Sequence, residues 1–193
     1  MASSSRVRVF LGCSVDGFIA GPDNDLSFLH GPTPSNPPAP SDGYLTYQAF
    51  MSQVGVLLMG RQTFDVVSAM DIDWPYGDTP VLVATHRPLE GAPSTVRAVA
   101  GDIRGLIAEA KATAGDRDVY LDGGNLARQG LDAGLVDELC LTLLPVLLGG
   151  TGTRLFDGLV QTHLMEFVGH HTGENGMVQL TLRPRPSSSR AAT

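Results

Sequence analysis

Short apolar runs alternate with amphipathic, helix-like segments over most of this chain, and this alternation restricts the fold more than any other feature. A strand that is followed by a helix returns to the sheet in the same direction, so the pattern predicts a largely parallel sheet. The runs expected to form strands are residues 6–13, 56–59, 80–84, 96–100, 118–121 and 139–148. The segments expected to form helices are residues 44–54, 62–70, 103–114 and 125–131.

The last part of the chain follows a different pattern. Two further strand-like runs, residues 164–170 and 177–183, are separated by a segment that contains Asn175-Gly176, which is typical of a hairpin turn. We therefore expect an antiparallel hairpin at one edge of the sheet. With no repeat and no second core, the sequence predicts one domain over residues 6–184, with disordered tails at 1–5 and 185–193.

Charge and composition exclude several classes of protein. A net charge of −7 is unfavourable for binding nucleic acid, and no apolar run approaches the length of a membrane span. Cys13 and Cys140 lie in strand-like runs, which is typical of buried thiols in a reducing compartment. Because residues 1–5 also lack a signal-peptide pattern, we expect a cytoplasmic protein. The five histidines show no metal-ligand spacing, so no metal is expected.

A long proline-rich segment follows the first strand. Residues 14–43 contain six prolines, from Pro22 to Pro40, and no clear helix or strand pattern. Loops of this length in a compact domain are usually functional or disordered. A role for residues 31–40 in substrate choice is one interpretation.

Asp122-Gly123-Gly124-Asn125 joins a buried strand to a helix. Paired glycines at such a junction permit a tight turn and leave backbone N–H groups exposed, where the helix dipole favours a phosphate. A purely structural turn is the alternative, because short glycine motifs are common.

Two other strand ends carry hydrogen-bond donors. Gly60-Arg61-Gln62-Thr63-Phe64 also joins a strand to a helix, although a surface arginine beside a helix cap explains it equally well. Ala84-Thr85-His86-Arg87 follows another strand and offers a hydroxyl, an imidazole and a guanidinium, or simply a solvated strand end. All three motifs fall at the carboxyl ends of predicted parallel strands, where open α/β sheets bind ligands. Together they favour a dinucleotide with several phosphates.

The three-glycine fingerprint of Rossmann domains is absent, and four ordered segments instead resemble the dihydrofolate-reductase superfamily. The similarity is greatest to the branch that holds the reductase domain of riboflavin biosynthesis and small stand-alone bacterial reductases. It covers residues 6–183. The segments are Ser14-Val15-Asp16-Gly17-Phe18-Ile19-Ala20, Met59-Gly60-Arg61-Gln62-Thr63-Phe64, Leu121-Asp122-Gly123-Gly124, and Pro145-Val146-Leu147-Leu148-Gly149-Gly150 with Leu155-Phe156. The resemblance implies a three-layer α/β fold, with a mixed, mostly parallel central sheet, helices on both faces and a C-terminal antiparallel hairpin.

The resemblance also implies NADPH as the cofactor and a homodimer as the assembly. Gly12, Ile19 and Ala20 would flank the nicotinamide ring, and Arg61 and Thr63 would hold phosphates. Thr85, His86 and Arg87 match the region that reads the 2′-phosphate, which favours NADPH over NADH. The expected cofactor contacts are Gly12, Ile19, Ala20, Gly60, Arg61, Gln62, Thr63, Thr85, His86, Arg87, Asp122, Gly123, Gly124, Asn125 and Leu126.

The chain departs from the folate enzymes where the substrate would bind. Those enzymes place an acid on the first helix, and counting back from Gly60 puts that position near Tyr44, with Asp42 just before the helix. They also hold the substrate carboxylate with an arginine, which residues 71–78 lack. No basic cluster lies in the first loop to hold a sugar phosphate.

Hydride transfer also requires a proton, and several residues are candidates for its donor. They are Asp16, Asp42, Tyr44 and Asp122, with an ordered water as a further option. Asp16 also suits a turn beside Gly17, and Asp122 suits a helix cap.

Aromatic side chains are the candidates for contact with the substrate. Phe28, Trp74 and Tyr76 would form an apolar lid, with Tyr44 beside them, although Trp74 equally suits an exposed loop.

The sequence thus predicts an NADPH-dependent reductase that transfers a hydride to a C=N or C=O bond of a small, heterocyclic substrate. A true dihydrofolate reductase and a 5-amino-6-ribosylaminouracil phosphate reductase are alternatives within the same fold. A nucleotide-binding module without turnover is the alternative from another class.

Overall fold

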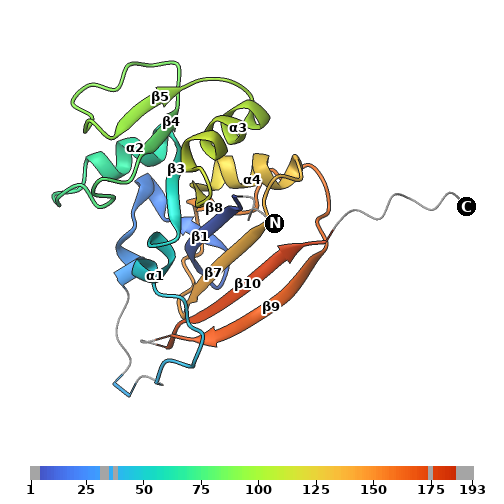
Figure 1. Cartoon of the computed structure of the whole chain (residues 1–193). Coiled ribbons are helices and arrows are strands. Elements are labelled where there is room, and N and C mark those ends of the chain that lie inside the picture. The colour runs from blue at the N-terminus through green and yellow to red at the C-terminus, as the bar shows by residue number, and fades with distance from the viewer. Residues whose placement is uncertain (1–4, 31–34, 37–38, 174–175, 186–193) are drawn as a thin grey trace, which may run out of the picture.

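A single eight-stranded sheet, in the order β5-β4-β3-β6-β1-β7-β10-β9, forms the centre of the molecule (Figure 1). The computed structural model describes residues 5–30, 35–36, 39–173 and 176–185. The strands of this sheet are β1 (Val7–Ser14), β3 (Val54–Gly60), β4 (Val81–Ala84), β5 (Val96–Val99), β6 (Asp118–Asp122), β7 (Glu138–Leu144), β9 (Met165–Thr172) and β10 (Val178–Pro184). The helices are α1 (Tyr47–Met51), α2 (Arg61–Ser68), α3 (Ile103–Ala114) and α4 (Gly124–Asp132), with short 3-10 turns η1 (Pro22–Asn24) and η2 (Ser27–His30).

The directions of the strands confirm the expected mixed, mostly parallel sheet. The six strands from β5 to β7 in the sheet order are parallel to their neighbours, and β10 is antiparallel to both β7 and β9. The terminal hairpin is therefore present at one edge. Asn175 of its predicted turn, most of the two predicted tails and parts of the proline-rich segment lie outside the described residues.

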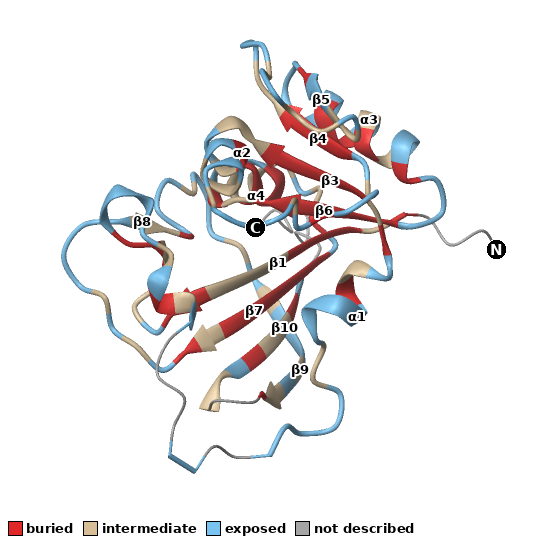
Figure 2. Ribbon diagram, turned by 90° about the vertical axis from the view of Figure 1, so that its left-hand side faces the viewer, coloured by how far each residue is buried: buried red, intermediate tan, exposed pale blue. Residues whose placement is uncertain are grey.

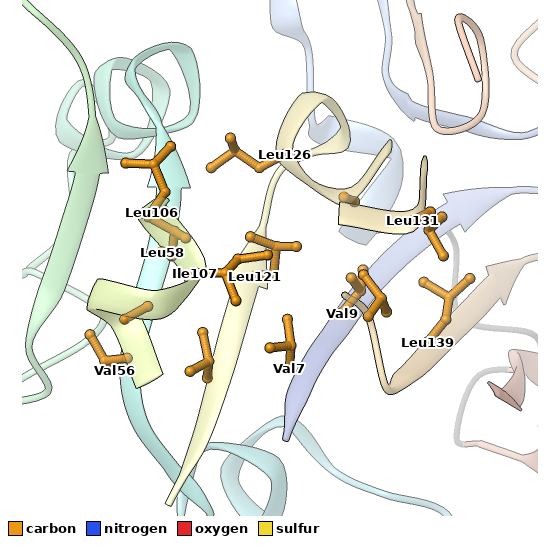
Figure 3. Close-up of a cluster of buried hydrophobic side chains, with 14 of the residues drawn as sticks. Val7, Val9, Val56, Leu58, Leu106, Ile107, Leu121, Leu126, Leu131 and Leu139 are labelled. Carbon is orange, nitrogen blue, oxygen red and sulfur yellow. The ribbon is translucent and has the colours of Figure 1, made fainter. Parts of the chain in front are cut away.

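The helices cover both faces of the sheet, which gives the expected three layers. Successive residues of β3 alternate between the two cores, because side chains of a strand point to opposite faces. Val56 and Leu58 join the cluster beneath α3 and α4, and Leu57 and Met59 join the cluster with α1 and α2. Figure 3 shows the first cluster, and Figure 2 shows that the buried residues follow the middle strands.

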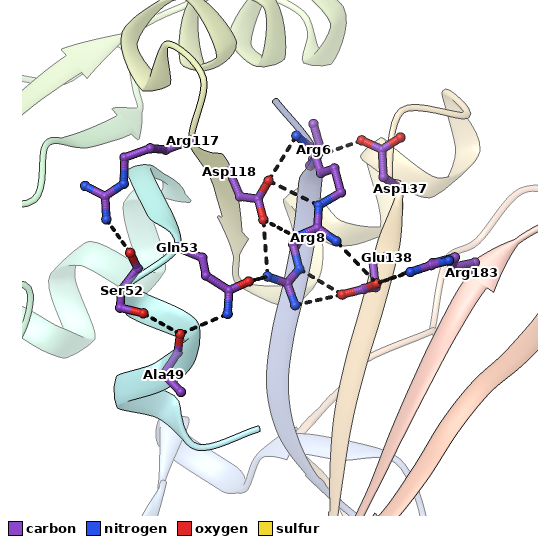
Figure 4. A network of polar contacts seen from close by, with 11 residues as sticks. Arg6, Arg8, Ala49, Ser52, Gln53, Arg117, Asp118, Asp137, Glu138 and Arg183 are labelled. Atoms are coloured by element: carbon purple, nitrogen blue, oxygen red, sulfur yellow. Dashed lines mark hydrogen bonds and ion pairs between the residues drawn. The ribbon is translucent and has the colours of Figure 1, made fainter. Parts of the chain in front are cut away.

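A buried ionic network closes the amino ends of β1, β6 and β7 (Figure 4). Arg8 lies 2.7 Å from the carboxylate of Glu138 and 3.2 Å from that of Asp118. Arg6 and Arg183 add further ion pairs to the same two carboxylates, at 2.6 Å and 3.1 Å. This network stabilises the end of the sheet opposite to the motifs described above.

The differences from the expected elements lie at their ends and in one loop. β7 ends at Leu144 instead of reaching residue 148, since Pro145 has no N–H for the ladder. The helix expected over residues 44–54 is reduced to the five residues of α1, and Val54 begins β3. Within residues 14–43, which we expected to be irregular, β2 (Phe18–Ala20) pairs with β8 (Thr153–Arg154) in a second small sheet.

No helix in the described part of the chain is long and apolar enough to cross a membrane.

Candidate active site

A cavity of about 430 Å³ lies at the carboxyl ends of β1, β3 and β6. It collects most of the residues that the sequence motifs singled out. Of the expected cofactor contacts, those that line it are Gly12, Ile19, Ala20, Gly60, Gln62, Thr63, Asp122, Gly123, Gly124, Asn125 and Leu126. The motifs therefore meet in space, although they are far apart in the sequence.

Two helices begin side by side at this cavity. Gly60 is the N-cap of α2 and Gly123 that of α4, and neither helix start is capped by a side chain. The two starts are neighbours because Met59 and Asp122, the residues just before the caps, are partners in the β3–β6 register. Uncapped N–H groups and the positive ends of two helix dipoles favour an anion at this place.

The starts of the other two helices, α1 and α3, are capped by side chains. Thr46 accepts a hydrogen bond from Ala49 N–H in α1, and Asp102 accepts one from Gly105 N–H in α3. Such caps satisfy the exposed N–H groups within the protein. The contrast marks the starts of α2 and α4 as the two that are available to a ligand.

Gly123 and Gly124 are also required by the protein itself. Gly123 has a φ of +89°, and a Cβ there would collide with the hydroxyl of Thr63. A Cβ on Gly124 would lie 2.6 Å from Cδ1 of Ile19. The glycines thus bring α2 and β2 close to the start of α4, so they have a structural role at this turn.

A second hollow of about 310 Å³ continues the cavity toward β4. It shares Gly60, Gln62, Asn125 and Leu126 with the first, and Arg61, Thr85 and His86 line it further out. Arg61 is already paired there, because its guanidinium lies 2.6 Å from Asp65 and donates to the Pro88 carbonyl at 2.9 Å. Arg87 lines neither hollow and faces Asp65 at 3.7 Å.

At its inner end, the cavity is formed by aromatic side chains around one carboxyl group. We call the set of Phe10, Tyr47, Tyr76, Tyr120 and Asp122 the tyrosine end. The hydroxyl of Tyr120 lies 3.2 Å from Oδ1 of Asp122, and that of Tyr76 lies 3.4 Å from Oδ2. The Tyr120 hydroxyl also reaches the carbonyl oxygen of Phe10, at 2.8 Å.

Asp122 is the buried acid of the site. Burial raises the pKa of Asp122 to about 6, while hydrogen bonds from Tyr120, the Gly123 N–H and Tyr76 limit the rise. Burial and the nearby Asp122 carboxylate raise the pKa of Tyr47 to about 12, and the same causes raise the pKa of Tyr76. An acid with a pKa near neutrality in a ligand cavity suits proton transfer.

Asp16, another candidate for the proton, lies outside the cavity and joins two loops. Its carboxylate accepts hydrogen bonds from the Ser14 hydroxyl at 2.6 Å and from the N–H groups of Leu148 and Gly149 at 3.2 and 2.8 Å. The Ser14 hydroxyl, followed by the Gly149 N–H, lowers the pKa of Asp16 to about 2. This group is ionised at neutral pH, and the geometry agrees with the turn interpretation.

The remaining predicted substrate and proton residues also do not line the cavity. Asp42 is exposed, and Tyr44 packs against Gly173 at the end of the terminal hairpin. Phe28 is buried on η2, and its neighbour Leu29 lines the cavity instead.

Trp74 is not an exposed loop residue. It packs against Phe64 and Tyr76, with ring centroids 6.0 Å and 5.1 Å away, and only Tyr76 of this group reaches the cavity. The aromatic lid predicted from the sequence is thus a supporting layer behind one tyrosine.

Sequence reasoning missed Tyr47 and Tyr120. Tyr120 lies two residues before Asp122 on β6, so both side chains are on the same face of the strand, a signal that was available. Tyr47 opens α1, and placing it required the correct start of that short helix.

The sheet order, the helices on both faces and the cavity at the carboxyl edge define a dihydrofolate-reductase-like domain. The chain belongs to the family of the RibD C-terminal domain, whose sequence profile matches residues 5–179. It is thus a domain of the riboflavin-biosynthesis reductase type, as the motifs suggested.

Solved structures agree with this assignment. A protein from Shewanella sp. PV-4, provisionally assigned to riboflavin biosynthesis, is 32% identical and has a TM-score of 0.79, over 94% of this chain and 99% of that one. Acinetobacter baumannii RibD is 18% identical, with a TM-score of 0.66 over 95% of this chain and 58% of its own. Dihydrofolate reductase from Enterococcus faecalis, complexed with NADP(H) and an inhibitor named RAB-propyl, is 14% identical, with a TM-score of 0.62 over 96% and 100%. The last two show the fold alone.

One curated relative is similar over most of its length. The uncharacterized protein YwjB of Bacillus subtilis is 25% identical over 154 residues, which are 80% of this chain and 84% of that protein. Its name assigns no activity.

Proposed function

We propose that this protein is an NADPH-dependent reductase that transfers a hydride to a C=N or C=O bond of a small, heterocyclic substrate. One observation carries the proposal: two uncapped helix starts and the buried acid Asp122 line the same cavity. An anion site and a proton donor within one cavity are what reduction by a phosphorylated cofactor requires.

The residues of the cavity fit a dinucleotide. The N–H groups that follow Gly60 and Gly123 would hold the pyrophosphate, and Arg61 with His86 in the second hollow would face the 2′-phosphate. Glycines at both helix starts let a ligand approach the backbone, and a Cβ on Gly60 would meet no protein atom within 4 Å. The open space above Gly60 is therefore available to the cofactor.

The other end of the cofactor would lie between β1 and β2. Gly12, Ile19 and Ala20 line the cavity there and would flank the nicotinamide, which supplies the hydride when bound. The tyrosine end then remains for the substrate, because it contains none of the residues assigned here to the phosphates or to the nicotinamide.

Asp122 is the proposed proton donor. Reduction of a C=N bond breaks its π bond, and the carbon gains the hydride while the nitrogen gains a proton. Asp122 gives that proton from its carboxyl group and is protonated again from solvent. Tyr76 and Tyr120 hold the carboxyl group in place through their hydroxyls.

A true dihydrofolate reductase is less well supported. α1, with the sequence YQAFM, carries no acidic residue, so the acid of the folate enzymes has no counterpart on that helix. The only carboxyl group among the described residues of the cavity comes from β6 instead.

We also propose a homodimer in a reducing, cytoplasmic compartment. Cys13 and Cys140 are both buried and unpaired, which suits such a compartment. The edge strand β9 exposes Phe167 and Val168, which a second copy would cover. Sedimentation of the purified protein as a monomer would contradict the dimer.

Cofactor binding is the test of the proposal. The protein is titrated with NADPH and NADH while cofactor fluorescence is followed, and we expect NADPH to bind at micromolar concentration and more tightly than NADH. Absence of NADPH binding would contradict both the reductase hypothesis and the binding-module hypothesis.

A turnover assay then distinguishes the reductase from the nucleotide-binding module. Dihydrofolate and a panel of cyclic imines and ketones are added to the NADPH complex, and oxidation of the cofactor is followed by absorbance. We expect oxidation with members of the imine and ketone panel. NADPH binding without oxidation by any compound favours the module without turnover.

A further inference from the structure

The tyrosine end contains one acidic side chain and no basic side chain. Among the described residues that line the cavity, Asp122 is the only carboxylic acid and Arg128 the only guanidinium. Arg128 stands on α4, where its Nη1 would lie 3.0 Å from a Cβ on Gly124, so it lies beside the start of α4 and is not part of the tyrosine end. The same nitrogen donates to the carbonyls of Arg154 and Leu155, at 3.1 and 3.0 Å.

The segment that supplies Phe10 and Tyr47 to the tyrosine end carries no lysine or arginine. Between Arg8 and Arg61 the sequence contains four aspartates and one histidine, His30, and no glutamate. This segment supplies Phe10, Gly12, Ile19, Ala20, Leu26, Leu29 and Tyr47 to the cavity. His30 is not among the lining residues.

Two further arginines, Arg154 and Arg8, are engaged in other contacts. Arg154 donates to the backbone carbonyl of Asp16 at 2.6 Å, and its guanidinium stacks on the ring of Phe18 at 4.1 Å. Arg8 is buried in the ionic network at the opposite end of β1. No described cation is therefore positioned to neutralise a negative charge at the tyrosine end.

We propose that the substrate of this site carries no phosphate or carboxylate group, and is a planar ring that is uncharged or carries a protonated nitrogen. The proposal rests on the proposed reductase function and names its substrate class. An anion in this pocket would be desolvated between aromatic rings, without a counter-charge and beside the Asp122 carboxylate. A neutral or protonated ring stacks on those rings, and Asp122 attracts its N–H groups.

Two matched pairs of compounds test the proposal on the NADPH-loaded protein. The first pair is dihydroisoquinoline and its derivative with a carboxylate on the ring. The second pair is naphthaldehyde and its derivative with a carboxylate on the ring. Binding is measured by saturation-transfer NMR and turnover by cofactor absorbance. We expect the uncharged or protonated member of each pair to bind about ten-fold or more tightly than the carboxylate.

A variant that adds a cation provides the reciprocal test. Tyr47→Lys places an ammonium group in the tyrosine end, and we expect it to bind the carboxylates about ten-fold more tightly than the native protein does. Val160→Lys, at a site with 83% exposure, adds the same charge outside the cavity and should change neither pair.

The outcomes are distinct. Equal or tighter binding of the carboxylates by the native protein overturns the proposal, and so does the absence of binding by all four compounds. Failure to bind NADPH overturns the reductase function instead. In that case the two pairs are compared on the protein alone, where the same preference still tests the charge of the pocket.

Discussion

The hydroxyl of Tyr120 lies within hydrogen-bond distance of both Oδ1 of Asp122, at 3.2 Å, and the carbonyl oxygen of Phe10, at 2.8 Å. A phenol has one proton, so the Tyr120 hydroxyl is shared between these two acceptor oxygens. Burial raises the pKa of Asp122, and the hydrogen bond from Tyr120 limits that rise.

Replacing this acid should remove turnover and leave cofactor binding intact. We expect Asp122→Asn to lower kcat by about 100-fold or more, since general acids contribute roughly that much. The Kd for NADPH should change little, because the helix starts are untouched. Asp102→Asn is the matched control, since Asn also caps a helix, and its kcat should stay near the native value. Unchanged kcat in Asp122→Asn would exclude Asp122 as the donor.

The rate should also depend on pH in a definite direction. Because the pKa of Asp122 is raised to about 6 and the protonated form is the active one, kcat should be constant below that pH and fall as pH rises above it. The profile is measured under saturating NADPH and substrate. A rate that rises through pH 6 would mean that Asp122 acts as a base.

The free energy of unfolding should also depend on the protonation of Asp122. The folded protein binds the Asp122 proton more tightly than the unfolded chain, so stability is greatest at low pH and decreases as pH rises from about 4 to about 6. By this linkage the ionised group costs about 3 kcal/mol at pH 7. Asp122→Asn should therefore unfold at higher denaturant than the native protein at pH 7, and the gain should shrink at pH 4. An equal effect at both pH values would contradict the raised pKa.

Alanine at two glycines should have opposite effects. Gly123→Ala adds a side chain at a φ of +89° and against Thr63, so we expect a loss of about 1–3 kcal/mol and weaker NADPH binding. Gly105→Ala lies in the regular helix α3 and should gain about 0.5–1 kcal/mol. Urea denaturation and NADPH titration check both variants. A Gly123→Ala protein as stable as native would refute the close approach.

The ionic network should matter for stability alone. Arg8→Met removes the nearest partner of the buried Glu138 carboxylate and one of the two partners of Asp118, and breaking a buried pair typically costs about 3–5 kcal/mol. Arg97→Met removes an exposed pair with Glu109 and should cost less than about 1 kcal/mol. Both are measured by urea denaturation. Near-native stability of Arg8→Met would show that the network contributes little.

The sequence was sufficient for the fold and for the two helix starts that meet at the cavity. Alternating apolar runs and glycines at strand ends are local signals, so β3, β6 and the start of α4 were predicted within a few residues. The tyrosine end was not predicted, because it depends on how β6 and α1 meet across the sheet. Asp122 was recognised as a candidate proton donor, but only the packed structure distinguishes it from Asp16. The carboxylate of Asp16 accepts hydrogen bonds from backbone N–H groups.

The contacts of Asp16 bear on how the protein is made. Its carboxylate binds Gly149, 133 residues later in the chain, and Arg154 donates back to the Asp16 carbonyl across 138 residues. β1 likewise pairs with β6 and β7, which are synthesised long after it. Since such distant contacts close late, the wall of the cavity formed by β2 is completed only when residues near 154 have left the ribosome. The strand that carries Ile19 and Ala20 thus gains its partner strand only late in translation, and the cavity is one of the last features of the fold to be completed.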